Sequence, residues 1–188
     1  MVVENKRSQH TKSLIKNALI DLLLKESFNS ITVKKICEKA EVNRSTFYAY
    51  YKDPVELLSV IEEETIDLII NSFSMDIPSD SIIDYIDHFL IEVKDNHERF
   101  KVLLGLQADP LFSEKLISKV GQATLIKAIL SEKVSIPTSN ITQLIYCGTF
   151  YMSGAYSIIV KWINANYDLS TRELAFVLRD MLKKCFDI

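Results

Sequence analysis

Apolar residues recur along this chain at three- and four-residue spacings, which is the period of an amphipathic helix. Leu14, Ala18, Leu19 and Leu22 form the first such stripe, and similar stripes follow through most of the 188 residues. Only four glycines and four prolines interrupt the pattern, so long segments hold no residue that breaks a helix. The pattern predicts an all-α protein. Helices are expected over about residues 8–27, 33–39, 44–50, 54–73, 80–97, 99–107, 110–133 (with a break near Gly121), 141–166 and 171–186, with loops at 75–79 and 137–140.

Polar residues at the expected helix starts support several of these boundaries. Thr32 and Asn43 precede the second and third helices, where a side-chain oxygen accepts a hydrogen bond from a backbone N–H that has no partner within the helix. Asp53 is followed by Pro54, and proline suits the first helical position because its missing N–H is not needed there. Ser170 caps the last helix in the same way.

Charge is divided unevenly along the chain. Residues 1–52 contain 10 Lys/Arg and 5 Asp/Glu, whereas residues 53–188 contain 12 and 20, which together give the net charge of −3. A basic head on an acidic body is expected when one end of a protein meets DNA. We therefore predict a DNA-binding domain over 1–52 and a second domain over 53–188, with the helix 53–73 connecting them.

Several other classes of protein are disfavoured. No apolar run reaches the ~18 residues of a membrane span, and the polar start of the chain lacks the core of a signal peptide, so we expect a cytoplasmic protein without a membrane partner. The three cysteines lie far apart, which predicts neither a disulfide framework nor a metal site. No catalytic motif is evident, and no cofactor is expected.

Two short helical patterns around a tight turn make residues 31–52 the most informative segment. A helix that enters the major groove presents its first side chains to base edges, while flanking groups bind phosphates. Arg44 suits bidentate binding of guanine, whereas Phe47 and Tyr51 are expected in the core. The predicted DNA-binding residues are Thr32, Lys34, Lys35, Arg44, Ser45, Thr46, Tyr48, Ala49, Tyr50 and Lys52.

The same segment resembles the tetracycline-repressor (TetR) family of bacterial transcriptional regulators. The resemblance covers about residues 11–62 and rests on Ile31-Thr32, Ile36, Ala40, Val42, the run from Ser45 to Lys52, and Glu56-Leu57-Leu58. It implies an all-helical homodimer, usually of nine helices, in which the first three bind DNA and a variable body binds a small effector. Two positions depart from the family pattern: Glu41 replaces a glycine in the turn, and Pro54 replaces a lysine that contacts phosphate.

The body is expected to supply a dimer interface and an effector site. Small and apolar residues of the last two helices suit an isologous four-helix interface, and the predicted residues are Gly154, Ile158, Trp162, Leu174, Val177, Leu178 and Met181. Aromatic and aliphatic residues suit an apolar or aromatic effector of unknown identity, and the predicted lining is Tyr85, Phe89, Phe100, Leu104, Phe112, Leu125, Tyr146, Phe150 and Tyr151. In both cases ordinary packing within one chain is the alternative.

These observations favour a ligand-responsive repressor that binds a near-palindromic operator as a homodimer. Three alternatives stay open at this point. One is an activator whose head needs a ligand or partner before it binds DNA. Another is a helical protein-interaction module with a disabled head, which the glutamate at position 41 and the proline at position 54 would favour. The third is an enzyme, which the absence of catalytic motifs makes the weakest of the three.

Overall fold

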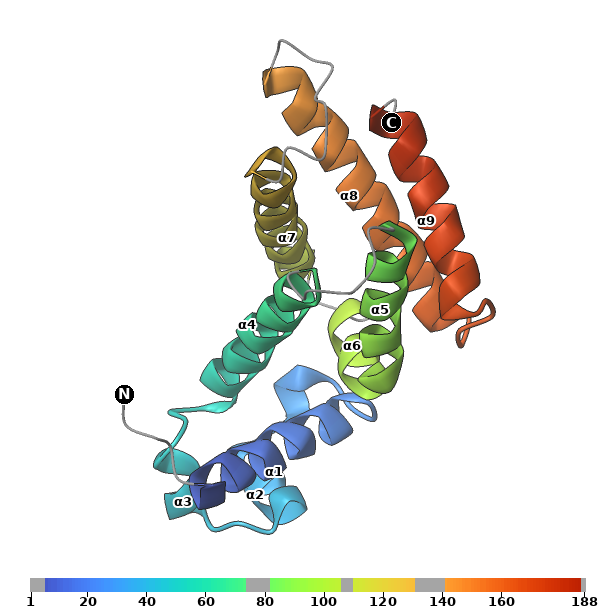
Figure 1. Ribbon diagram of the computed structural model, residues 1–188. Helices are drawn as coiled ribbons and strands as arrows, with labels where there is room; N and C mark the ends of the chain where they lie inside the picture. The colour runs from blue at the N-terminus through green and yellow to red at the C-terminus, as the bar shows by residue number, and fades with distance from the viewer. Residues whose placement is uncertain (1–5, 74–81, 106–109, 131–140, 187–188) are drawn as a thin grey trace. The chain divides into compact units, whose positions relative to one another are not determined.

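The computed structural model describes residues 6–73, 82–105, 110–130 and 141–186, and in these ranges every regular element is a helix. The all-α prediction is confirmed (Figure 1). The loops predicted at 75–79 and 137–140 lie outside the described residues. The elements are α1 (Lys6–Leu23), a short 3-10 turn η1 (Phe28–Ser30), α2 (Val33–Ala40), α3 (Arg44–Tyr48), α4 (Pro54–Ser72), α5 (Ile82–Asp95), α6 (His97–Leu104), α7 (Pro110–Leu130), α8 (Ile141–Asn164) and α9 (Thr171–Phe186).

The helix starts follow the capping predictions. The Asp53 carboxylate accepts a hydrogen bond from the Glu56 N–H at 2.9 Å, directly before Pro54 opens α4. At the start of α9, the Ser170 hydroxyl accepts from the Glu173 N–H at 3.2 Å, and the Glu173 carboxylate accepts from the Ser170 N–H at 2.9 Å. This reciprocal pair is a capping box, which satisfies two backbone donors at once.

Several helix limits differ from the prediction by a few residues, and α1 and α7 show the two clearest differences. The first helix ends at Leu23 rather than near residue 27, because the chain enters the 3-10 turn and Ser27 is extended, with φ −64° and ψ 143°. α7 runs through Gly121 without a break. A glycine inside a helix costs only ~1 kcal/mol relative to alanine, and packing of α7 against α8 offsets a cost of that size.

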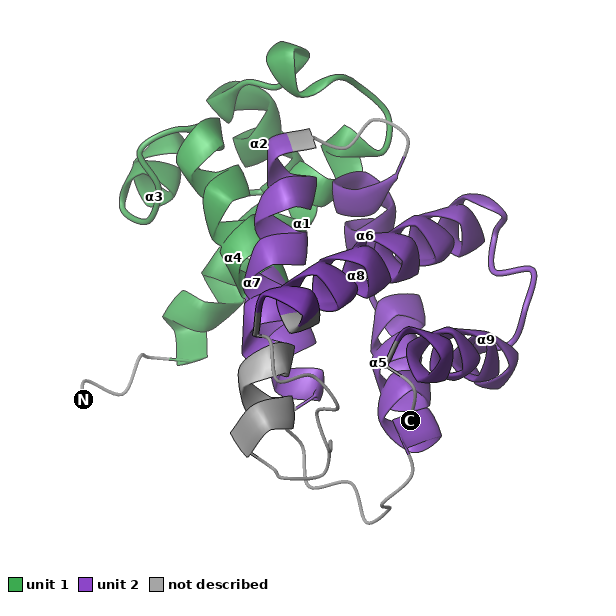
Figure 2. Cartoon of the chain, turned by 90° about the horizontal axis from the view of Figure 1, so that it is seen from above, with its two compact units in different colours: residues 1–65 green, residues 66–188 purple. Residues whose placement is uncertain are grey.

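The chain forms two compact units, residues 1–65 and 66–188, and the division falls within α4 (Figure 2). In the first unit α2 packs against both α1 and α3. Ion pairs at 2.8 Å join Lys16 to Glu64 and Lys39 to Asp21. The core of this unit is mainly aliphatic, and its most buried members are Ile15, Leu19, Ile36, Phe47, Leu57 and Ile61.

In the second unit α9 packs along α5, and α8 packs against α6, α7 and α9. Arg172 ties the start of α9 to α5 by ion pairs with Asp84 and Asp87. The hydroxyls of Ser113 on α7 and Tyr156 on α8 lie 2.7 Å apart. The most buried side chains of this unit include Leu90, Val93, Phe100, Leu174 and Ala175.

Candidate DNA-binding surface

The short helix α3 is held by one polar cap and one buried ring. The side-chain oxygen of Asn43 accepts a hydrogen bond from the Thr46 N–H at 2.7 Å, which satisfies a donor in the first turn. Phe47 is fully buried, whereas Arg44 and Ser45 are exposed and Tyr48 is 58% exposed. Because an isolated helix of this length is unstable in water, these two contacts fix which side chains it presents to solvent.

The aromatic residues at the end of α3 form a connected cluster. The Phe47 ring centroid lies 5.6 Å from that of Tyr48 and 5.9 Å from that of Tyr51. Tyr51 is buried, so the expectation that Phe47 and Tyr51 belong to the core is confirmed. Tyr50 is half-buried, and the Lys12 ammonium of α1 lies 5.5 Å from its ring centroid. The contact adds the Lys12 cation to the candidate surface. The sequence does not predict this, because no local pattern links α1 to residue 50.

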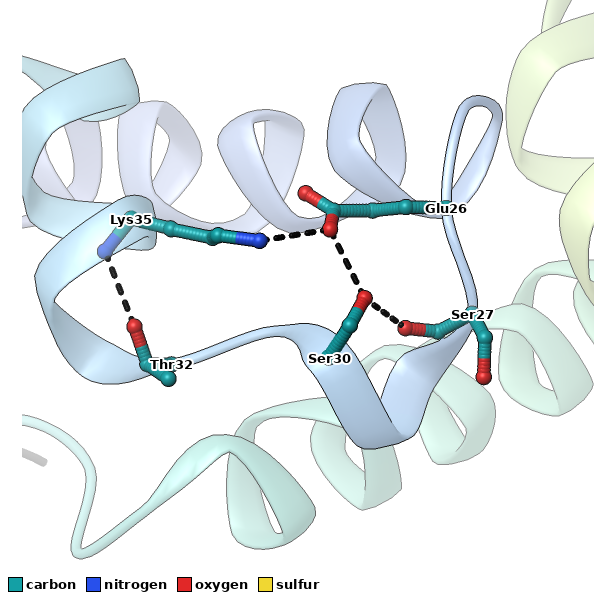
Figure 3. Close-up of polar contacts among 5 residues, drawn as sticks. All are labelled: Glu26, Ser27, Ser30, Thr32 and Lys35. Atoms are coloured by element: carbon teal, nitrogen blue, oxygen red, sulfur yellow. Dashed lines mark hydrogen bonds and ion pairs between the residues drawn. The ribbon is translucent and has the colours of Figure 1, made fainter.

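The entry to α2 carries a network of polar contacts. Thr32 caps the helix by accepting from the Lys35 N–H at 3.3 Å, and Thr32 and Lys34 are exposed. The Lys35 ammonium lies 2.6 Å from the Glu26 carboxylate, which also accepts from the Ser30 hydroxyl at 2.7 Å (Figure 3). Hydrogen bonds from Lys35 and then from Ser30 hold the pKa of Glu26 below its usual range. Lys35 is one of the predicted DNA-binding residues, and here its charge is already paired.

The turn between α2 and α3 is closed by Glu41 in a left-handed conformation, with φ 55° and ψ 38°. Its N–H makes the last helical bond, to the Cys37 carbonyl, and the left-handed residue then turns the chain so that the Val42 N–H donates to the same carbonyl at 3.0 Å. Glu41 thus has a positive φ at the position where the family pattern has glycine, and a side chain there costs ~1–2 kcal/mol of strain. The exposed Glu41 carboxylate also places a negative charge beside the candidate surface.

Lys52 and the start of α4 bound this surface on its other side. Lys52 is exposed, and its backbone N–H donates to the Glu56 carboxylate. Asp53 and Glu56 thus both accept backbone hydrogen bonds at the N-terminus of α4. Two carboxylates at the N-terminus of α4 disfavour phosphate binding to this helix end. This agrees with the presence of proline, and not lysine, at position 54. Ala49, the remaining predicted contact, is exposed directly after α3.

The nine predicted effector-lining residues do not form one lining. Phe89, Phe100, Leu104 and Phe112 are buried in the body, and Tyr85 is half-buried on α5. Tyr146 and Phe150 are instead exposed on α8. Leu125 lies outside the side chains that the structure describes. Tyr151 is half-buried and its hydroxyl donates to the Leu178 carbonyl at 3.3 Å, while burial raises its pKa to about 12.

A mainly apolar groove of about 360 Å³ lies between α8 and α9. Three of the predicted dimer residues, Gly154, Ile158 and Met181, line this groove. A fourth, Val177, is exposed on α9. Three others correct the prediction: Trp162, Leu174 and Leu178 are almost fully buried within a single protomer, because α9 packs along α5 and α8 packs on its neighbours. The groove is lined by Phe150, Tyr151, Gly154, Ala155, Ile158, Met181, Lys184 and Cys185.

The described part of the chain bears on two further classes of site. No group of three or more His, Cys, Asp or Glu residues in it is placed to hold a metal ion. None of its helices is long and apolar enough to cross a membrane.

Comparison with known proteins assigns the family. Residues 80–184, more than half the chain, match the family model of the TetR transcriptional-regulator C-terminal region. In sequence, 69 residues are 36% identical to the transcriptional activator of the dhaKLM operon, DhaS, from Lactococcus lactis. That segment spans only 37% of each protein.

Solved structures extend the likeness over at least nine-tenths of the chain. A TetR transcriptional regulator from Streptococcus agalactiae is 26% identical, with a TM-score of 0.69 over 96% of this chain and 97% of its own. FadR from Bacillus subtilis, solved in complex with stearoyl-CoA, shares the fold at 15% identity, with a TM-score of 0.67 over 90% of this chain and 96% of its own. This chain therefore belongs to the TetR family of transcriptional regulators.

Proposed function

We propose that this regulator binds a specific operator by placing α3 in the major groove. The observation that carries the proposal is the division of side chains on α3, where Phe47 is buried while Arg44, Ser45 and Tyr48 face solvent. In this arrangement Arg44, Ser45, Thr46 and Ala49 contact bases. The phosphate contacts come from Thr32, Lys34, Tyr48, Tyr50 and Lys52, with Lys35 contributing less because Glu26 already neutralises it.

Salt dependence separates this function from the interaction-module alternative. Fluorescence anisotropy of a labelled random-sequence duplex, titrated with the purified full chain at several salt concentrations, measures how affinity falls with ionic strength. A protein that neutralises several phosphates loses affinity steeply, with a slope of about −0.9 per phosphate on logarithmic axes. A helical interaction module with a disabled head would give no such binding at low salt.

We further propose that the chain acts as a homodimer through the groove between α8 and α9. The groove is mainly apolar, and a Cβ built on Gly148 or Gly154 meets no atom within 4 Å in the protomer, so a second pair of helices can approach closely there. Phe150 and Tyr146 are 73% and 70% exposed on the same helix. Burial of large apolar side chains is a main driving force for association.

A charged substitution in this groove tests the dimer. Phe150→Asp is expected to shift the chain from dimer to monomer in sedimentation equilibrium, because the carboxylate would have to be desolvated in the interface. Leu111→Asp is the matched control, since Leu111 is 72% exposed on α7 and does not line the groove. A dimer that is equally stable in both variants would contradict this placement of the interface.

The direction of regulation is proposed as repression, since a dimer that covers two adjacent major grooves excludes other proteins from that DNA. Activation is the second candidate, because the similar protein DhaS is an activator. Transcription from a template that carries the operator, with and without the protein, distinguishes the two. If adding the protein raises the amount of transcript, the protein is an activator and not a repressor. The DNA-binding proposal is not affected by that result.

We propose an effector with an apolar or aromatic part, which shifts the body between two arrangements. This is supported by the buried Phe89, Phe100 and Phe112 of the body and by the fold shared with FadR, whose structure contains stearoyl-CoA. A ligand that binds only the folded state raises its melting temperature. Long-chain acyl-CoA is expected to raise it, with free CoA as control, and no shift with any apolar ligand tried would oppose the proposal.

A further inference from the structure

The side-chain oxygen of Asn43 is the meeting point of three hydrogen bonds at the start of α3. Asn43 itself is extended, with φ −82° and ψ 162°. Its Oδ1 lies 2.7 Å from the Thr46 amide nitrogen, 2.6 Å from the Ser45 hydroxyl and 2.8 Å from the Thr46 hydroxyl. Beyond capping the helix, Asn43 therefore contacts the two hydroxyl side chains that follow Arg44.

The direction of these bonds follows from the chemistry of the groups. A backbone N–H can only donate, so the Asn43 atom that meets the Thr46 amide must be the carbonyl oxygen and not the NH₂ group. An amide oxygen can only accept. Both hydroxyls must then donate to it, and each hydroxyl has a single proton. In the free protein the protons of Ser45 and Thr46 are committed to Asn43.

This commitment sets what the two hydroxyls can offer to DNA. With its proton engaged, a hydroxyl retains lone pairs and acts as an acceptor. The donors in the major groove are the amino groups of adenine and cytosine, whereas guanine O6 and N7 and thymine O4 are acceptors. A partner that offers only an acceptor would have to draw a proton away from Asn43 and break that hydrogen bond. Phosphate oxygens are also acceptors only, so binding them through these hydroxyls would break the same hydrogen bond.

We propose that Asn43 is a specificity-determining residue that makes α3 present one donor followed by two acceptors. Arg44 supplies the donor and selects guanine, while Ser45 and Thr46 select adenine or cytosine. This rests on the proposed function, in which α3 enters the major groove. Asn43 and the three residues that make up the pattern have surface positions: Asn43, Arg44 and Ser45 are exposed, and Thr46 is half-buried.

The test is selection of binding sites from random duplex DNA with five purified full-length proteins: wild type, Ser45→Ala, Thr46→Val, Asn43→Gly and Asn43→Asp. The first two variants identify the base pairs that each hydroxyl reads. Asn43→Gly frees both hydroxyls with little loss of capping. Asn43→Asp retains the accepting oxygen and is the matched control. Thermal melts establish that each variant folds.

Wild type and Asn43→Asp are expected to prefer adenine or cytosine at the two assigned positions by roughly two- to tenfold, the contribution of one hydrogen bond. Asn43→Gly should lose this preference there while keeping guanine opposite Arg44. An unchanged preference in Asn43→Gly would overturn the role of Asn43. If that variant fails to fold, the role is overturned when wild-type binding stays unchanged after the adenine or cytosine of an assigned pair is replaced by an analogue that lacks the amino group. Failure of wild type to select any site would instead reject the proposed function itself.

Discussion

The Glu26 carboxylate and the Lys35 ammonium form an ion pair at 2.6 Å across the turn that enters α2. The pair neutralises a lysine that the sequence assigns to phosphate binding. Removing the carboxylate should therefore strengthen DNA binding. Glu26→Gln keeps the size of the side chain, and we expect higher affinity for all duplexes alike and a salt slope steeper by about 0.9, equivalent to one more neutralised phosphate.

The matched control for that variant is Asp21→Asn, which removes one negative charge from the same unit. Asp21 pairs with Lys39, in the last turn of α2 and away from the entry. Anisotropy titrations over a range of salt concentrations compare the two. An equal change in slope for both variants would mean that only the net charge of the head matters.

The same carboxylate predicts a pH dependence of stability. Its pKa is lowered in the folded protein by hydrogen bonds from Lys35 and Ser30, so the folded state favours the ionised form. The stabilisation is present above the unfolded pKa of about 4.3 and is lost as pH falls through the lower folded pKa. Urea unfolding from pH 7 to pH 3 should show wild type converging on Glu26→Gln below about pH 4.3. The difference is small at every pH because the pair is only partly buried and solvent screens it.

Arg44 is expected to carry specificity at one base pair. Arg44→Ala should cost about 1–3 kcal/mol of operator binding and relax the preference at that pair alone. Competition titrations with operators mutated singly at each position measure both effects. Unchanged affinity and specificity would show that Arg44 does not face the bases.

Tyr48 is expected to contribute affinity without specificity. Its ring packs edge-on against Phe47 while most of the residue is exposed, so its hydroxyl can donate to a phosphate. Tyr48→Phe should weaken binding to all duplexes by a similar factor. Loss confined to particular base pairs in the same competition titrations would instead assign Tyr48 to base contact.

Glu41 combines backbone strain with an unfavourable charge. Glu41→Gly should raise the free energy of unfolding by about 1 kcal/mol, because glycine adopts a positive φ without the Cβ clash. Glu41→Gln retains the strain and removes only the charge, so it should strengthen DNA binding without stabilising the fold. Urea unfolding and anisotropy titrations separate the two effects. Equal stability of the Gly and Gln variants would refute the strain argument.

Much of the fold follows from local sequence because its causes are local. The caps at Thr32, Asn43, Asp53 and Ser170 each involve a side chain and a backbone N–H three residues on. The left-handed conformation of Glu41 is also a local property of the turn. The early end of α1 was missed because apolar residues continue to Leu24, so periodicity gives no signal for the 3-10 turn that follows.

Features that depend on tertiary approach were not predictable in the same way. The pairing of Lys35 with Glu26 and the contact of Lys12 with Tyr50 join residues from separate elements. Periodicity identified the apolar faces of α8 and α9, but it does not reveal whether the protomer or a second copy covers them. The pattern therefore predicts Trp162 and Leu174 as interface residues, although the protomer itself buries them.

Selection of binding sites from random duplex DNA, using the purified wild-type chain at two salt concentrations, tests the central claim most directly. We predict an enriched near-palindrome at both concentrations, whose half-sites are spaced by about one helical turn or slightly more, roughly 34–36 Å or above. Failure to enrich any sequence at either salt concentration would contradict the account and favour a helical interaction module.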